Sequence, residues 1–115
     1  MKKQELKNIL NIITDKLRKD YHPEKIILYG SYAYGEPTEH SDIDLFIIKD
    51  TDKDWLDRFV EVKRLVYNRD RYIPISPLVY TPEEVKDRLE WGDAFIKEIL
   101  KKGEVLYAAW KQWYK

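Results

Sequence analysis

The sequence contains no cysteine and few histidines. The lack of cysteine excludes disulfide bonds, thiolate catalysis and zinc sites with cysteine ligands, and it is typical of proteins from a reducing cytosol. Two histidines, His22 and His40, are too few for a histidine-rich metal site. We therefore predict a cytoplasmic protein.

The sequence also lacks an excess of either charge and any long apolar run. It has 21 lysines and arginines against 21 aspartates and glutamates, so its formal net charge is 0. Without an overall positive field, long DNA or RNA is not an expected partner, although a local phosphate site is compatible with this composition. No apolar run approaches the roughly 18 to 20 residues of a membrane span, and "MKKQELKNILNII" lacks the apolar core of a signal peptide. We predict no membrane association.

What the sequence does contain is an alternation of helical and strand-like segments. Apolar residues recur at spacings of three and four in residues 2–21 and 52–70, which predicts two amphipathic helices. Short apolar runs at residues 25–29 and 42–49 predict buried strands, and residues 71–80 predict a third. The residues expected to face the core from the second helix are Trp55 or Leu56, Phe59, Val62 and Val66.

Two prolines constrain the third strand. Pro74 and Pro77 are an odd number of residues apart, so their missing N–H groups would face opposite edges of a strand. An edge position cannot accommodate both, and we expect strand pairing to start near Pro77.

Capping residues mark two further helices. Thr81, Pro82 and Glu84 form a capping-box pattern with proline at the first helical position, which predicts a helix start. Asp93 is expected to cap another helix, which ends at Gly103. This order of elements predicts an α/β (α+β) fold, with a small mixed β-sheet and helices packed mainly on one face. At 115 residues, the chain is expected to form a single domain over residues 1–115.

The stretch "GSYAYGEPTEHSDIDLFII" begins with Gly30 and Ser31 directly after a predicted strand. Glycine lets the backbone turn sharply and approach a ligand. If Ser31 begins a helical turn through Tyr34, its hydroxyl and the free N–H groups of that turn would form a phosphate site. The alternative is a plain strand-to-helix turn in which Ser31 is only an N-cap.

Asp42 and Asp44 stand two residues apart in a strand-like run. The strand period of two places both carboxylates on one face, roughly 6 to 7 Å apart at the backbone. Two like charges there cost stability unless a cation offsets them, and Mg²⁺ is suited to carboxylates and substrate phosphates. The alternative is a solvated strand entrance that holds no metal.

The combination of the two motifs is more specific than either alone. Gly30-Ser31, ten residues and then Asp42-x-Asp44 resembles the signature of polymerase-β-like nucleotidyltransferases, especially their minimal, MNT-type members. The segments "HPEKIILYGS", "LVYTPEEV" and "FIKEILKKGEVLY" also resemble that group, so the likeness covers most of the chain after the first helix.

This resemblance implies a nucleotidyltransferase-like fold and specific roles for four residues. Gly30 and Ser31 would hold the phosphates of a nucleoside triphosphate, with ATP as the expected nucleotide. Asp42 and Asp44 would be catalytic, binding the nucleotide through two Mg²⁺ ions. The reaction would be attack of a hydroxyl on the α-phosphorus with loss of pyrophosphate. MNT-type proteins are commonly paired with HEPN-domain proteins as antitoxins, so a HEPN-type protein is the expected acceptor and partner.

The sequence departs from the family pattern at Ser76. Family members usually carry a third carboxylate there, and no acidic residue lies between Tyr72 and Thr81. A serine hydroxyl is a weak metal ligand and cannot accept a proton near neutral pH. Turnover has been lost, or an acid such as Asp70 or Glu83 reaches the site, or a partner completes it.

A second departure is Tyr34, where many MNT-type members have arginine. Its loss removes a cation for phosphate binding, for which Lys25 or Lys49 could compensate. Tyr34 could stack on a base together with Tyr29 and Tyr32, or these rings could serve packing alone.

Two functions follow from the sequence. The first is a Mg²⁺-dependent nucleotidyltransferase acting on a hydroxyl, with a protein acceptor favoured over nucleic acid by the zero net charge. The second is a catalytically weak or inactive module that binds nucleotide and a partner. The exposed aromatics expected in "AAWKQWYK" would suit a partner surface. A homo-oligomer is compatible with the sequence, which does not determine the oligomeric state.

Overall fold

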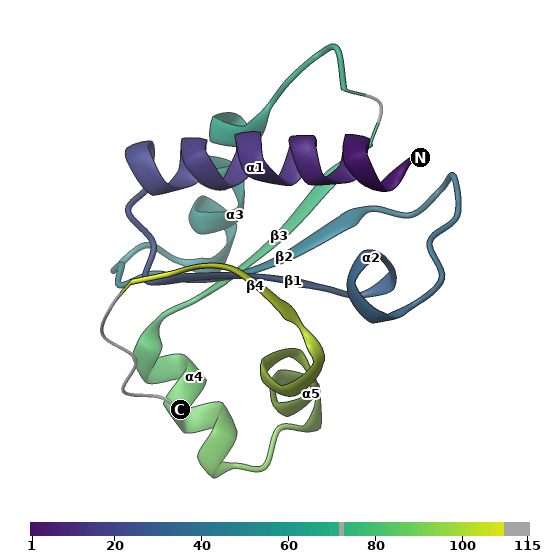
Figure 1. The fold of residues 1–115 in the computed structure, drawn as a ribbon. Coiled ribbons are helices and arrows are strands. Elements are labelled where there is room, and N and C mark those ends of the chain that lie inside the picture. Colours follow the sequence, from purple (N-terminus) through teal and green to yellow (C-terminus); the bar gives the residue numbers. More distant parts are fainter. Residues whose placement is uncertain (72, 110–115) are drawn as a thin grey trace.

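The computed structural model describes residues 1–71 and 73–109. Helices and strands alternate along most of this chain (Figure 1). In chain order they are α1 (Lys3–Asp20), β1 (Lys25–Tyr29), α2 (Ser31–Tyr34), β2 (Ile43–Ile48), α3 (Trp55–Val66), β3 (Ile75–Tyr80), α4 (Pro82–Glu90), α5 (Ala94–Lys102) and β4 (Glu104–Ala108).

The four strands form one mixed sheet in the order β3-β2-β1-β4. The pair β2 and β3 is parallel, whereas β1 is antiparallel to both of its neighbours, β2 and β4. The predicted α/β fold with a small mixed sheet is therefore confirmed. β2 and β1 are the inner strands, and β3 and β4 are the edges.

Helices cover both faces of this sheet, not mainly one as we expected. In Figure 1, α1 and α3 lie on one side, and α4 and α5 lie on the other. Each side has its own buried cluster, one centred on α1 and α3 and the other on α5 and the start of α4. The physical reason lies in β2, where residues 45–48 are all 0% exposed. A strand buried on both faces requires cover on both.

The inward face of α3 differs from the prediction at its first turn. Val62 and Val66 are buried as expected, but Trp55 and Leu56 are 60% and 58% exposed. The buried position one turn before Val62 is occupied by Arg58. The buried positions 58, 62 and 66 recur every four residues, and Leu56 points away from them. Trp55 begins the helix and stacks on Phe59, which is partly buried.

β3 starts at Ile75, two residues earlier than we predicted. Ile43 donates its N–H to the carbonyl of Pro74 over 2.9 Å, and Ile75 is the first residue in register with β2. In a parallel ladder with this register, the N–H groups of even-numbered β3 residues point to β2, so Pro77 turns its missing N–H to the open edge. Pro74, which would face β2, lies just outside the strand.

The predicted helix caps are present. Thr81 and Glu84 form the full capping box of α4, and Asp93 accepts hydrogen bonds from Phe95 and Ile96 at the start of α5. The segment after Gly103 forms β4. The aromatics predicted to form a partner surface at Trp110 and Trp113 lie outside the described residues. No helix in residues 1–71 and 73–109 is long and apolar enough to cross a membrane.

Candidate functional site

The predicted turn after β1 is a single helical turn. Gly30 adopts a positive φ of +76°, and its carbonyl accepts hydrogen bonds from the N–H groups of Ala33 and Tyr34. A side chain at position 30 would place its Cβ 2.3 Å from Oδ2 of Asp44. Glycine is therefore required twice here, by the backbone conformation and by the nearby carboxylate.

The register of the sheet sets three side chains in a row. Asp44 of β2 pairs with Tyr29 of β1 on one side and with Ser76 of β3 on the other. Their neighbours Ile27, Phe46 and Leu78, two residues further along each strand, belong to the cluster under α5. Because side chains alternate along a strand, all three residues of the row lie on the α4 and α5 face.

Asp42 precedes β2 and is exposed, whereas Asp44 is partly buried. The spacing of two places Asp42 on the same side as Asp44. Burial raises the pKa of the Asp44 carboxyl, and the charge of Asp42 raises it further. The structure thus brings Gly30, Asp42 and Asp44 together, and Ser31 begins the helical turn beside them.

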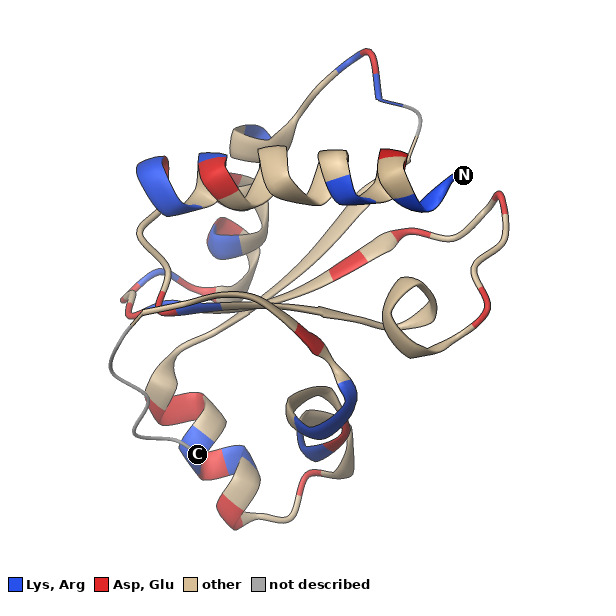
Figure 2. Ribbon diagram, in the orientation of Figure 1, with Lys and Arg blue, Asp and Glu red and all other residues tan. Residues whose placement is uncertain are grey.

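The segment from the end of β1 through β2 shows acidic residues and no basic ones in Figure 2. Residues 30–48 include Glu36, Glu39, Asp42 and Asp44 but no lysine or arginine. Their oxygens are the donors that hard divalent cations prefer. Two carboxylates that repel each other, with no basic residue in the segment, fit a Mg²⁺ ion that also binds substrate phosphates.

Neither lysine considered as a substitute cation lies at this end. Lys25 pairs with Ile48, at the opposite end of β1 from Gly30. Lys49 follows Ile48 and donates its Nζ to the carbonyl of Tyr21 over 2.6 Å. The antiparallel pairing of β1 with β2 brings both lysines to the far end of the sheet, which corrects that expectation.

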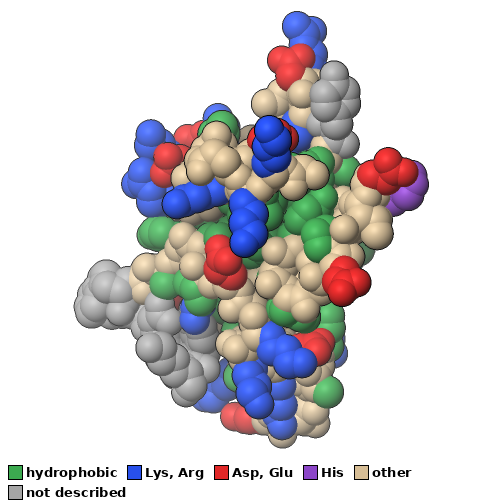
Figure 3. All heavy atoms as spheres, turned by 45° about the vertical axis from the view of Figure 1, so that its right-hand side comes forward, with side chains coloured by type: hydrophobic (Ala, Val, Ile, Leu, Met, Phe, Trp, Pro, Cys, Tyr) green, Lys and Arg blue, Asp and Glu red, His purple; other side chains and the backbone are tan. Residues whose placement is uncertain are grey.

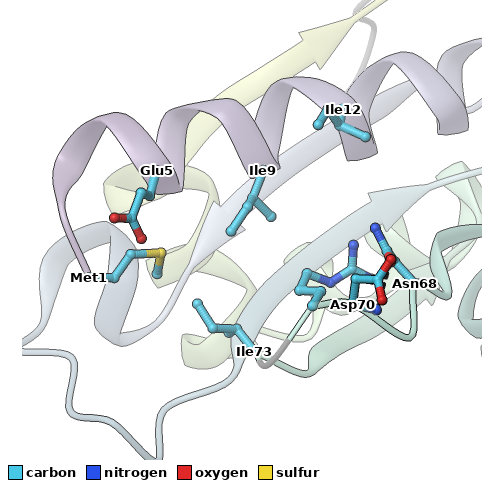
Figure 4. A pocket seen from close by; sticks show the side chains of 8 residues that line it. Met1, Glu5, Ile9, Ile12, Asn68, Asp70 and Ile73 are labelled. Carbon is cyan, nitrogen blue, oxygen red and sulfur yellow. Dashed lines mark hydrogen bonds between the residues drawn. The ribbon is translucent and has the colours of Figure 1, made fainter.

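Ser76 occupies the position at which a third carboxylate would face Asp44. Glu83 is no substitute, because it follows the far end of β3, and the five strand residues from Ser76 to Tyr80 alone span roughly 13 Å. Asp70 lines a cavity of about 390 Å³ between α1 and the segment before β3, where its N–H binds Asn68 (Figure 4). Among residues 1–71 and 73–109, no three His, Cys, Asp or Glu side chains come together to hold a metal ion.

The three tyrosines near Gly30 do not form one cluster. Tyr32 packs against the core under α1 and lines a cavity of about 400 Å³ there. Tyr29 packs on the other face, where burial first, and then the charges of Asp44 and the neighbouring tyrosines, raise its pKa to about 12. Its ring meets Phe95 of α5 edge to face, with centroids 5.8 Å apart. The sequence did not single out Phe95, because an apolar residue in an amphipathic helix is expected to pack in the core.

The architecture agrees with what comparisons of the chain with known proteins show. Residues 11–112 match the family model described as "Polymerase beta, Nucleotidyltransferase". A protein of Methanocaldococcus jannaschii named "Putative protein adenylyltransferase" is 34% identical over 89% of this chain and 94% of its own length. Another of the same name and organism is 36% identical over 74% of this chain and 61% of its own length. The chain belongs to the polymerase beta nucleotidyltransferase family.

Proposed function

We propose that the chain binds a Mg²⁺–nucleoside triphosphate, ATP first, and transfers its adenylyl group to a hydroxyl of a protein. The observation that carries this proposal is the contact of the Gly30 turn with Asp44. A phosphate-type turn and a carboxylate pair that face one another can hold the two parts of a metal–nucleotide complex. The names of the relatives, which specify protein adenylyltransferases, support the choice of adenylyl and of a protein acceptor.

Each residue of the site has a distinct task in this proposal. Gly30 lets the backbone approach the phosphates, and Ser31 donates its hydroxyl to a phosphate oxygen. Asp42 and Asp44 would hold two Mg²⁺ ions, which when bound stabilise charge on the attacking and leaving oxygens. A new bond forms between the acceptor oxygen and the α-phosphorus, while the bond to the β-phosphate bridge breaks and pyrophosphate leaves.

The attacking hydroxyl must lose its proton in this reaction, and a base has to accept it. The position facing Asp44 carries Ser76, which accepts no proton near neutral pH. A HEPN-domain protein, the partner implied by the MNT-type pattern, is the acceptor we favour, with this chain as its antitoxin. Its own side chains could supply the missing base.

The same observation supports a second candidate function. With a serine opposite Asp44, the site keeps the groups that bind Mg²⁺–nucleotide and lacks the group that speeds transfer. A binding module that senses nucleotide or docks on its partner would need no more than this.

Transfer of label from α-labelled ATP to a HEPN-type partner separates the two functions. Wild type, Ser76→Asp and, as a size-matched neutral control, Ser76→Asn would be compared with Mg²⁺ present. Label on the partner with wild type, abolished by Asp44→Asn, supports the enzyme. Label with Ser76→Asp alone sinks the enzyme hypothesis and leaves the binding module.

A further inference from the structure

We propose that Phe95, whose ring meets that of Tyr29 edge to face, forms a stacking subsite for the base of the nucleotide. The proposal rests on the proposed function, because it places the base of a nucleotide whose phosphates lie at Gly30 and Asp44. It predicts a preference for purine over pyrimidine nucleotides.

The exposure of Phe95 is not explained by packing of the core. Phe95 is 47% exposed, whereas its neighbours Ile96 and Ile99 are 0% exposed and fix α5 on the sheet. Asp93 accepts hydrogen bonds from the N–H groups of Phe95 and Ile96 over 3.0 and 3.1 Å. The backbone that carries the ring is thus held in place, so stacking on it costs little ordering entropy.

Tyr29 connects this ring to the carboxylates. The ring of Phe95 meets Tyr29 at an interplanar angle of 81°, so Phe95 rests on an edge contact with Tyr29. Tyr29 itself is the direct cross-strand neighbour of Asp44. Cross-strand neighbours lie about 5 Å apart, so Phe95 lies roughly one aromatic ring further from Asp44 than Tyr29 does.

Tyr34, the last residue of α2, lies near Tyr29. Its side chain is 39% exposed, and its hydroxyl is near enough to that of Tyr29 to contribute to the raised pKa of Tyr29. Figure 3 brings this side of the molecule forward and shows hydrophobic side chains at the surface among charged ones.

A base is the ligand that this surface suits. Residues 30–48 carry acids without lysine or arginine, so a further anionic group is disfavoured, whereas a neutral base is not. An aromatic ring stacks on any base, and modest preferences follow from stacking strength, which increases with the area of the base. Purines, with two rings, would therefore bind more tightly than pyrimidines.

Calorimetric titration with Mg²⁺–ATP and with Mg²⁺–tripolyphosphate tests the subsite, because the second ligand keeps the phosphates and lacks the base. The variants are Phe95→Leu, which keeps apolar contact with Tyr29, and Phe95→Trp, which keeps an aromatic face. Trp55→Ala is the matched control, since Trp55 is an exposed aromatic on α3, on the other face of the sheet. Melting temperatures establish that each variant is folded.

We expect Phe95→Leu to weaken ATP binding about 10-fold, the effect of about 1.4 kcal/mol, with tripolyphosphate binding unchanged. Phe95→Trp should bind ATP at least as tightly as wild type, and Trp55→Ala should match wild type. Equal ATP affinity of Phe95→Leu and wild type overturns the subsite and leaves the proposed function intact. Failure of wild type to bind either ligand overturns both.

Discussion

Gly30 is the residue on which the geometry of the site depends most directly. The Cβ of Gly30→Ala would collide with Oδ2 of Asp44, and alanine at φ +76° is strained. We expect this variant to lose about 1–3 kcal/mol of stability and to bind Mg²⁺–ATP at least 10-fold more weakly, measured by denaturant unfolding and calorimetry.

Gly92 supplies a matched control for that variant. It also has a positive φ, +80°, but a Cβ there would meet no atom within 4 Å. Gly92→Ala should therefore lose stability through backbone strain and retain wild-type nucleotide affinity. Equal loss of affinity in the two variants would show that strain, and not the carboxylate contact, explains the effect.

We expect the Asp44 carboxylate to destabilise the folded protein, although the proposed metal binding needs it. Because its pKa is raised in the fold, the folded state favours the protonated carboxyl. The ionised carboxylate therefore lowers the free energy of unfolding. This loss is absent at low pH and appears as pH rises through the normal aspartate range. Asp44→Asn should raise Tm by a few degrees at about pH 7, the effect of about 1 kcal/mol or less.

Thermal melts at about pH 7 and about pH 3 measure this penalty, since most aspartates are protonated at the lower pH. The difference in Tm between Asp44→Asn and wild type should shrink toward zero at the lower pH. Asp42→Asn should give a smaller rise, because Asp42 is the second cause of the raised pKa and burial is the first. A fall in Tm on Asp44→Asn at neutral pH would contradict the assignment.

At the scale of helices and strands, Arg58 joins two layers. From α3 it donates to the carbonyls of Lys53 and Val79 and to Glu84 of the α4 capping box, the last over 2.7 Å. Burial alone would raise the pKa of Glu84, but the hydrogen bonds from Arg58 and Thr81 outweigh it and lower that pKa. The pair thus links helices on opposite faces of the sheet around the edge strand β3.

Arg58→Met should cost about 2–3 kcal/mol, because it leaves Glu84 and a buried carbonyl without this donor. Urea unfolding measures the loss, which should decrease as pH falls through the pKa of Glu84 and the carboxylate is protonated. Arg88→Met is the control, since the Arg88 side chain is 46% exposed and its ion pair with Asp93 is long, at 3.6 Å, so that the change in stability should be about 1 kcal/mol or less. Similar losses in both variants would refute the special role of Arg58.

Local signals in the sequence predicted most of the elements and left their layering open. The capping residues of α4 and α5, the helical turn after Gly30 and the alignment of Ser76 with Asp44 are confirmed. The caps and the helical turn depend on neighbours in sequence, whereas the position of Ser76 opposite Asp44 followed from the resemblance to the family pattern. The position of Phe95 could not be predicted, because its contact with Tyr29 depends on how α5 lies on the sheet.

For the molecule as a whole, the net charge is zero, but the charged residues are unevenly distributed along the chain. Residues 30–48 carry acids without a lysine or arginine, so ATP alone would meet repulsion at the site, and two carboxylates alone are a poor Mg²⁺ site. We expect calorimetry to detect tight binding only when ATP and Mg²⁺ are added together, and EDTA to abolish it. Equally tight ATP binding in EDTA would require a cation of the protein itself at the phosphates.

The pairing of β4 with β1 has a consequence for synthesis. Gly30, Ser31, Asp42 and Asp44 all emerge from the ribosome early, and so do the three strands that β4 joins. Until residues 104–108 follow, β1 has no partner on one side, and a bare strand edge readily recruits another chain. The nascent protein is therefore most prone to self-association through β1 after its site residues exist and before β4 pairs with that strand.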